Sequence, residues 1–174
     1  DNPELPIFII TIAFFIFASS FFALSETAIT ESHKSRLEKL ADEEGKHADA
    51  ALKILDDPEK ILSVVQVGIT FTSILIGLLI GGAVAPILAE AISFLPYSHL
   101  AAAVASTAVI AYISLLLGEF LPKKIALQDP ERCLIRFASW LTRLERSMRP
   151  AVSCLSGSAK VILLFIGVNP DKPD

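Results

Sequence analysis

The composition of the 174-residue chain indicates a membrane protein, because 53% of its residues are hydrophobic and its mean hydropathy is +0.60. These values are too apolar for an ordinary water-soluble domain of this size. The net charge of −4 gives no reason to expect nucleic-acid binding. Lys and Arg are absent before Lys34 and between Ile61 and Pro122, and these gaps outline apolar segments.

The first apolar segment covers residues 7–28, which is enough for a membrane-spanning helix of roughly 20 residues. A cleaved signal peptide is the alternative. Residues 1–6 hold no basic residue, however, and the apolar run exceeds the roughly 7–15 residues of a signal-peptide core. We therefore expect a retained span with Ser25 and Glu26 near its cytoplasmic end. Glu26 is expected to pair with Lys34 or Lys123 rather than to bind an ion directly.

Residues 31–60 are predicted to form two helices outside the membrane. Apolar residues recur there in steps of three, four and seven, which is the spacing of one helical face. Gly45 is expected to separate the two helices, because glycine weakens a helix interior. Asp57 and Pro58 suit the N-cap and the first turn of the helix that follows.

The second span is expected over residues 61–82. Its small and polar residues recur in steps of three and four and share one helical face: Ser63, Gln66, Thr70, Ser73 and Gly77. Polar groups at membrane depth are uncommon and often mark an ion pathway. Close helix packing is the alternative, and it is the better explanation for Ser73 and Gly77. For Gln66 and Thr70, ion binding and packing are equally open.

The third span, over residues 100–121, ends in a Gly-Glu-x-x-Pro motif. Pro122 has no N–H, so the carbonyl of Gly118, four residues earlier, loses its α-helical partner. Glu119 is the only charged side chain of this span. A carboxylate and a free carbonyl are hard oxygen ligands that suit Mg²⁺ or Ca²⁺. The alternative is that Pro122 only ends the helix and that Glu119 reaches water or pairs with Lys123.

Juxtamembrane helices are predicted over about residues 131–168. Apolar residues recur at helical spacing between Leu134 and Met148 with arginines around them, which indicates an amphipathic helix. Its apolar face could cover the membrane surface, where Trp140 suits the headgroup level, or a partner domain. The apolar residues that follow reach spanning length, but a cation at their centre, Lys160, costs about 3 kcal/mol in a membrane. We expect that segment to stay on the cytoplasmic side.

The positive-inside rule gives the orientation. The predicted fold is an all-α membrane protein with three spans in one domain over residues 1–174 and its N-terminus outside the cell. Residues 31–60 and the C-terminus are cytoplasmic, and residues 83–99 are outside. Such a chain is a multi-pass protein of the cell membrane. Cys133 and Cys154 both lie on the cytoplasmic side and are expected to be reduced.

Three motifs, taken in order, resemble the transmembrane (DUF21) domain of the CorC/cyclin-M (CNNM) family over the whole chain. They are Phe-Phe-Ala-Leu-Ser-Glu-Thr-Ala-Ile-Thr at 21–30, Val-Gln-Val-Gly-Ile-Thr at 65–70 and Gly-Glu-Phe-Leu-Pro-Lys-Lys at 118–124. The resemblance implies a homodimeric Mg²⁺ transporter, generally regarded as an exporter, with Na⁺ as a candidate coupling ion. It implies an ion site near Ser25, the middle of the second span and Gly118-Glu119. In one departure, many relatives carry Asn near positions 69 and 70, where this chain has Ile69 and Thr70.

The family ordinarily continues into CBS modules that bind ATP with Mg²⁺. This chain has no segment that could form those modules, so we expect no regulation by nucleotide in the piece described by the sequence. Small residues of the second and third spans suit close helix contact in a homodimer. They are Gly68, Gly77, Gly81, Gly82, Ala101, Ala102, Ala103, Ala105, Ala108 and Ala111.

The sequence thus leads to a hypothesis of Mg²⁺ transport across the bilayer through a site of oxygen ligands. Those ligands are Ser25, Ser63 or Gln66, Thr70, the Gly118 carbonyl and Glu119. The alternative is a passive membrane anchor and dimerisation module for cytoplasmic regulatory domains. No enzymatic activity is expected, because the chain has neither a His-Glu-x-x-His motif nor a pair of intramembrane Asp residues. The choice between Mg²⁺ and Ca²⁺ stays open at this point.

Overall fold

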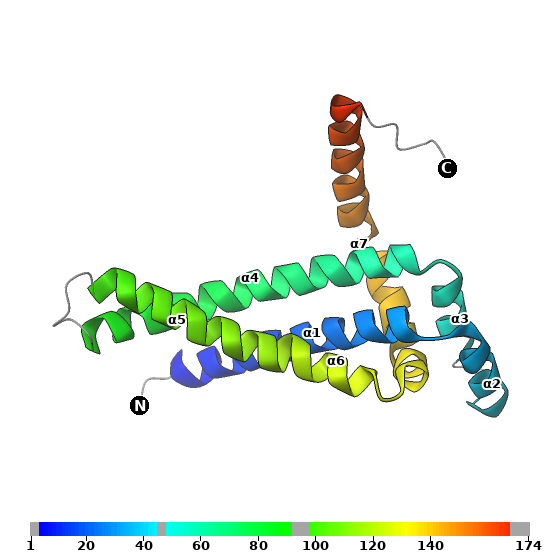
Figure 1. Cartoon of the computed structure of the whole chain (residues 1–174), viewed down its shortest axis with the longest axis horizontal. Helices are drawn as coiled ribbons and strands as arrows, with labels where there is room; N and C mark the ends of the chain where they lie inside the picture. Colours follow the sequence, from blue (N-terminus) through cyan, green and yellow to red (C-terminus); the bar gives the residue numbers. More distant parts are fainter. Residues whose placement is uncertain (1–3, 45–47, 92–97, 168–174) are drawn as a thin grey trace.

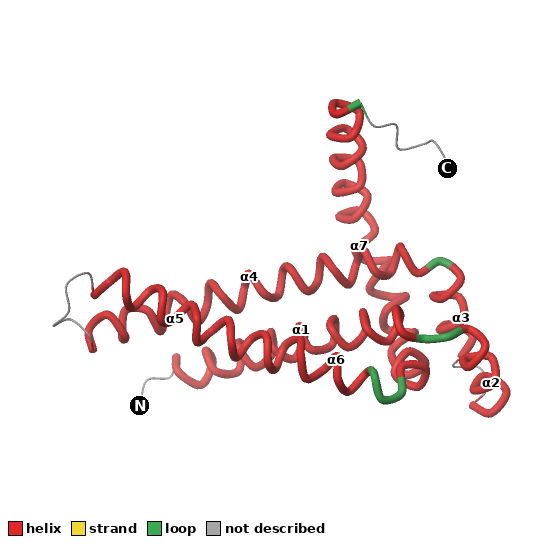
Figure 2. Tube along the Cα trace, in the orientation of Figure 1, coloured by secondary structure: helices red, strands yellow, loops and turns green. Residues whose placement is uncertain are grey.

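The computed structural model describes residues 4–44, 48–91 and 98–167, and every regular element in these ranges is a helix (Figure 2). The elements in chain order are α1 (Glu4–Glu31), α2 (Lys34–Glu44), α3 (Ala48–Asp56), α4 (Pro58–Ala91), α5 (Ser98–Leu115), the π-helix η2 (Leu116–Phe120), α6 (Leu121–Ala126) and α7 (Pro130–Ile166).

The three expected spans lie inside longer helices, which are α1, α4 and the continuous run from α5 through η2 to α6. These three rods lie side by side (Figure 1). The two helices expected over residues 31–60 are α2 and α3, and α4 begins at Pro58 as predicted. Gly45, which was expected to separate α2 from α3, lies outside the described residues.

Four helical segments within the described ranges are long and apolar enough to cross a membrane, one more than the sequence led us to expect. They are Pro6–Glu31, Pro58–Leu79, Leu100–Ala126 and Pro130–Ile166. The fourth belongs to α7, whose second half stands away from the other helices (Figure 1, orange to red). Pro150 lies inside α7, and it cannot donate the hydrogen bond that would continue the helix regularly. Length and composition alone therefore do not decide between three and four spans.

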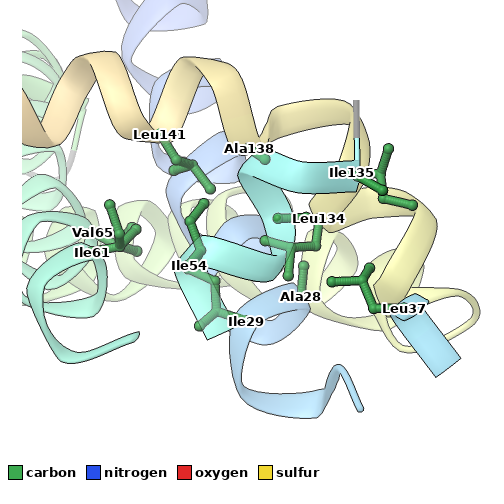
Figure 3. Packing of buried hydrophobic residues seen from close by; sticks show 12 residues of the cluster. Ala28, Ile29, Leu37, Ile54, Ile61, Val65, Leu134, Ile135, Ala138 and Leu141 are labelled. Atoms are coloured by element: carbon green, nitrogen blue, oxygen red, sulfur yellow. The ribbon is translucent and has the colours of Figure 1, made fainter. Parts of the chain in front are cut away.

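The main apolar core lies at the end of the bundle where α2, α3 and the first half of α7 meet α1 and α4 (Figure 3). Leu134 and Ala138 of α7 are completely buried there, against residues that include Ile29 and Ile54. The sequence left the membrane surface and a partner domain as alternatives for this apolar face. Both are wrong for its buried part, because the chain's own helices cover it. Trp140 lies on the opposite face and is 66% exposed.

Polar contacts join the elements around this core. The buried carboxylate of Glu131 in α7 accepts a hydrogen bond from the backbone N–H of His33, 3.1 Å away, and so ties the connection after α1 to α7. Lys34 of α2 pairs with Asp56 of α3. That hydrogen bond and the charge of Asp56 raise the pKa of Lys34. The first half of α7 is thus tied to the ends of the other helices by both apolar and polar contacts.

Replacing Asp129 by alanine is expected to lower the free energy of unfolding by about 1 kcal/mol. Asp129 is the N-cap of α7, and its carboxylate accepts a hydrogen bond of 3.2 Å from the backbone N–H of Arg132. Urea unfolding in detergent, followed by circular dichroism, measures the change. Asp129→Asn keeps a capping oxygen and serves as the control. Equal losses of stability in the two variants would argue against the capping role.

Candidate functional site

The Gly-Glu-x-x-Pro motif forms a break in the third span. The N–H of Leu121 donates to the carbonyl of Leu116, five residues earlier, instead of to that of Leu117. Pro122 has no N–H to offer to either Leu117 or Gly118. The Gly118 carbonyl therefore lacks its α-helical partner, as the sequence predicted, and the break frees the carbonyl of Leu117 as well. A π-helical turn of this kind often occurs at functional sites.

Two hydroxyl groups of α1 face these carbonyls. Ser20 Oγ lies 2.8 Å from the carbonyl oxygen of Leu117 and also 2.8 Å from that of Ile16, but its single proton serves one of them at a time. Ser19 Oγ lies 3.5 Å from the Gly118 oxygen, at the long limit for a hydrogen bond. The two carbonyls thus keep oxygen lone pairs available for a cation.

Gly118 allows close packing at this point. It is buried, and a Cβ atom added there would lie 3.1 Å from Ser19 Oγ. Any other residue would therefore require the Ser19 side chain or α1 to shift. Ser19 and Ser20 are not among the site residues predicted from the sequence, although two adjacent hydroxyl residues in an otherwise apolar part of the first span are a usable signal.

Glu119 is half-buried next to these carbonyls. Among the residues that the structure describes, its carboxylate makes no hydrogen bond or ion pair. Lys123, the expected alternative partner, instead forms an ion pair of 2.9 Å with Glu26 of α1. This confirms the prediction that Glu26 pairs near the end of the span. Glu119 therefore has no basic side chain as an ion-pair partner within the described part of the chain.

Ser25 lies farther along α1 than the break. Its hydroxyl is buried and donates to the Phe21 carbonyl at 2.7 Å. Ser19 meets Gly118, and six residues of helix separate Ser19 from Ser25 by about 9 Å along the axis. The neighbouring Glu26 reaches Lys123, so Ser25 lies closer to the level of Lys123 than to that of Gly118. Ser25 is therefore displaced along the helix axis from the Gly118-Glu119 pair, near which the family resemblance implied that it would lie.

The polar face of α4, called here the polar stripe, faces the second half of α7 rather than α1. Ser63, Gln66 and Thr70 line a cavity of about 530 Å³ between α4 and the second half of α7. On the opposite side of α4, Gly68 packs against the ring of Phe22 in α1. The six predicted site residues are thus placed in two regions, with Ser25, Gly118 and Glu119 along α1 and the break, and Ser63, Gln66 and Thr70 toward α7.

The ligands available for a metal ion are mostly uncharged. No group of three or more His, Cys, Asp or Glu side chains lies together within residues 4–44, 48–91 and 98–167. Ser63 Oγ donates to the Glu59 carbonyl at 2.8 Å, whereas the side chains of Gln66 and Thr70 make no hydrogen bond in the described part of the chain. The two regions together offer carbonyl, hydroxyl and amide oxygens and one carboxylate, which are the kinds of ligand that suit a hard ion.

Comparisons with known proteins support the family resemblance that the three motifs indicate. The family described as "Cyclin M transmembrane N-terminal domain" matches residues 9–174. The chain is 36% identical over 163 residues to UPF0053 protein sll0260 of Synechocystis, covering 89% of this chain and 36% of that protein. It is 30% identical over 166 residues to UPF0053 protein YhdT of Bacillus subtilis, covering 93% of this chain and 36% of that protein.

A relative from Escherichia coli, described as UPF0053 inner membrane protein YfjD, is 27% identical over 153 residues, which are 88% of this chain and 33% of that protein. The chain therefore spans about a third of the length of these curated relatives. The family match extends from the first span to the end of α7 and includes all three motifs. The chain accordingly belongs to the cyclin M (CNNM) family of transmembrane domains.

Proposed function

We propose that this domain transports Mg²⁺ across the plasma membrane, as an exporter with Na⁺ as the coupling ion. The observation that carries the proposal is the unpaired, half-buried carboxylate of Glu119 beside two backbone carbonyls that have lost their helical partners. Charged groups at membrane depth are costly and usually serve an ion or a proton. Irregular backbone is tolerated at that depth where it lines a cavity.

The proposed topology has three spans, with the N-terminus outside and α2, α3 and α7 on the cytoplasmic side. In Figure 1 the start of α1 lies at the opposite end of the bundle from α2 and α3. Basic residues are confined to residues 34–60 and to those after Pro122, which favours placing that end inside. Pro150 and Lys160 favour α7 as a juxtamembrane helix, because both are unfavourable in a straight span.

Mg²⁺ would bind first at Glu119 and the Gly118 carbonyl. It requires nearly octahedral oxygen ligands at about 2.0–2.1 Å and gives up its water reluctantly, so these two groups would hold an ion that keeps several waters. Ser25 and the α4 groups Ser63, Gln66 and Thr70 would contribute oxygens only after the helices move. That movement would pass the ion from the cytoplasmic side to the outside. We propose no enzymatic activity.

A homodimer is the proposed assembly. A Cβ built on Gly77, Gly81 or Gly82 of α4 would meet no other helix within 4 Å among the described residues. Ala101 and Ala105 of α5 are exposed. Small exposed residues allow two helices to approach closely in a bilayer. Gly68, in contrast, is already used within the protomer, against Phe22.

The decisive test is Mg²⁺ titration calorimetry on the detergent-purified chain and on Glu119→Gln. Glutamine keeps an oxygen in place but removes the charge, so we expect binding about tenfold weaker, equivalent to about 1.4 kcal/mol. Glu90→Gln, an exposed carboxylate near the far end of α4, is the matched control and should bind like the parent.

Absence of Mg²⁺ binding in a folded, dimeric parent would favour the passive anchor instead. Equal binding by Glu119→Gln and the parent would move the ion site elsewhere. A parallel titration with Ca²⁺ tests selectivity, and displacement of Mg²⁺ by an equal concentration of Ca²⁺ would contradict a magnesium transporter.

A further inference from the structure

Two adjoining cavities run along the junction between α4 and α7, away from the break in the third span. One, of about 420 Å³, is lined by Lys60, Val64, Glu145, Arg149, Val152 and Ser153. The other is the 530 Å³ cavity beside the polar stripe, and its lining also includes Val152. Val152 lines both cavities, so they adjoin along α7, and together they are called the α4–α7 groove below.

The end of this groove near the start of α4 is charged. A third cavity, of about 200 Å³, adjoins the first there and shares Lys60, Glu145 and Arg149 with it. Lys53 and Asp57 line this third cavity. Glu145, with a side chain only 13% exposed, accepts two hydrogen bonds from Arg149, at 3.1 and 3.3 Å. Asp57 pairs with Lys60 at 2.6 Å.

The cationic groups of this cluster retain donors for a ligand. Three cations against two carboxylates leave one positive charge in excess, and Lys53 has no ion pair among the described residues. An ammonium group has three N–H donors and a guanidinium has five. Lys60 and Arg149 therefore still have N–H groups to offer after their pairs are made. Such a cluster suits a phosphate group, which brings charged acceptor oxygens.

The lining changes in character along α4. Lys60 at the charged end is followed by polar residues with valines between them, and then by two large apolar residues. In chain order this lining is Lys60, Ser63, Val64, Gln66, Val67, Thr70, Phe71 and Ile74. Phe71 and Ile74 are 61% and 63% exposed. From α7, the deeper part is lined by Leu155, Ser156 and Ala159. This order of charged, polar and apolar groups matches the order of phosphate, glycerol esters and acyl chain in a phospholipid.

We propose that the α4–α7 groove binds one phospholipid of the cytoplasmic leaflet, with its phosphate at Lys53, Lys60 and Arg149 and one acyl chain against Phe71 and Ile74. The inference rests on the proposed function for the cytoplasmic placement of α7. Basic pockets between helices at that side of a membrane are suited to lipid headgroups. Since the cluster carries only one excess charge, both anionic and zwitterionic phospholipids should bind.

Native mass spectrometry of the full chain in detergent, titrated with defined lipids, tests this site. We expect one dioleoylphosphatidylglycerol or dioleoylphosphatidylethanolamine per chain. Dioleoylglycerol, which has no phosphate, should bind at least tenfold more weakly. Inorganic phosphate alone should not displace the lipid at equal concentration. Phosphate binding as tight as phospholipid binding, or equal binding of dioleoylglycerol, would overturn the proposal.

Two variants address the two ends of the groove. Lys53→Gln combined with Lys60→Gln removes two exposed cations without leaving the buried Glu145 unpaired, and should weaken phospholipid binding about tenfold. Ala159→Phe should weaken it by filling the apolar end. Arg136→Gln combined with Arg143→Gln, on exposed positions of α7 that do not line the groove, is the charge-matched control. An equal loss in that control would indicate general charge attraction and would overturn the site, as would unchanged binding in either groove variant.

Mg²⁺ titration of the same samples separates this proposal from the proposed function. The Lys53, Lys60 double variant should bind Mg²⁺ like the parent, and Glu119→Gln should bind lipid like the parent. If the parent protein bound Mg²⁺ but no phospholipid, the lipid site alone would be overturned. If it bound phospholipid but no Mg²⁺, the ion site alone would be overturned.

Discussion

Replacing Pro122 by alanine is expected to weaken Mg²⁺ binding about a hundredfold, equivalent to about 2.7 kcal/mol. Alanine restores an N–H four residues after Gly118, so the π-helical break can close into a regular α-helix. The Gly118 carbonyl then becomes engaged within the helix, and Glu119 rotates relative to α1. Two ligands are lost together, which is why the effect should exceed that of Glu119→Gln.

The same substitution should change the stability of the fold little, because Pro122 lies in the first turn of α6, where proline is tolerated, and alanine is a good helix former. Calorimetry for Mg²⁺ and urea unfolding on one preparation therefore separate the two effects. Pro130→Ala is the control, since Pro130 occupies the first position of α7, where no helical N–H bond is lost. If Pro122→Ala bound Mg²⁺ as tightly as the parent, the freed carbonyls would have no role in ion binding.

Replacing Gly68 by leucine is expected to lower the free energy of unfolding by about 3 kcal/mol. A Cβ atom built on Gly68 lies 2.5 Å from the ring of Phe22, which is closer than any real contact. The bulk of a leucine would force α1 and α4 apart along the face where they pack. Urea unfolding measured by circular dichroism gives the change.

A second substitution can relieve that clash. Phe22→Ala in the Gly68→Leu background should restore at least half of the lost stability, because the ring is the group that the new side chain meets. Gly157→Leu, in the second half of α7, has open space around its Cβ position and should leave stability nearly unchanged. Failure of Phe22→Ala to restore stability would show that the α1 and α4 backbones limit the approach.

The helices were predictable because their signals are local. Apolar length places α1, α4 and the α5 to α6 run, and Pro58 marks the start of α4. The break in the third span also follows from one residue, Pro122, whose missing N–H acts four residues away. The sequence could not show that the break takes the π form, because that depends on which carbonyl the N–H of Leu121 reaches.

Contacts between helices were less predictable. The spacing of Gln66 and Thr70 places them on one face of α4 but does not say which helix faces them, and in the structure it is α7 rather than α1. The apolar face around Leu134 posed the same problem. Its periodicity indicates that the face is buried but does not identify the helices that bury it. In the structure, α1 to α4 of the same chain cover this face, and their arrangement depends on the loops between them rather than on the spacing of apolar residues.

The angle at which the second half of α7 leaves the bundle gives the domain an uneven cross-section (Figure 1). In the topology proposed above, the cytoplasmic leaflet would accommodate three rods together with this arm, in which residues 151–166 are all at least partly exposed. The outer leaflet would accommodate the rods alone. A body that is wider in one leaflet than in the other acts as a wedge. The domain should therefore favour curved regions of a membrane that relieve this mismatch in area, and its distribution between small and large vesicles would report the preference.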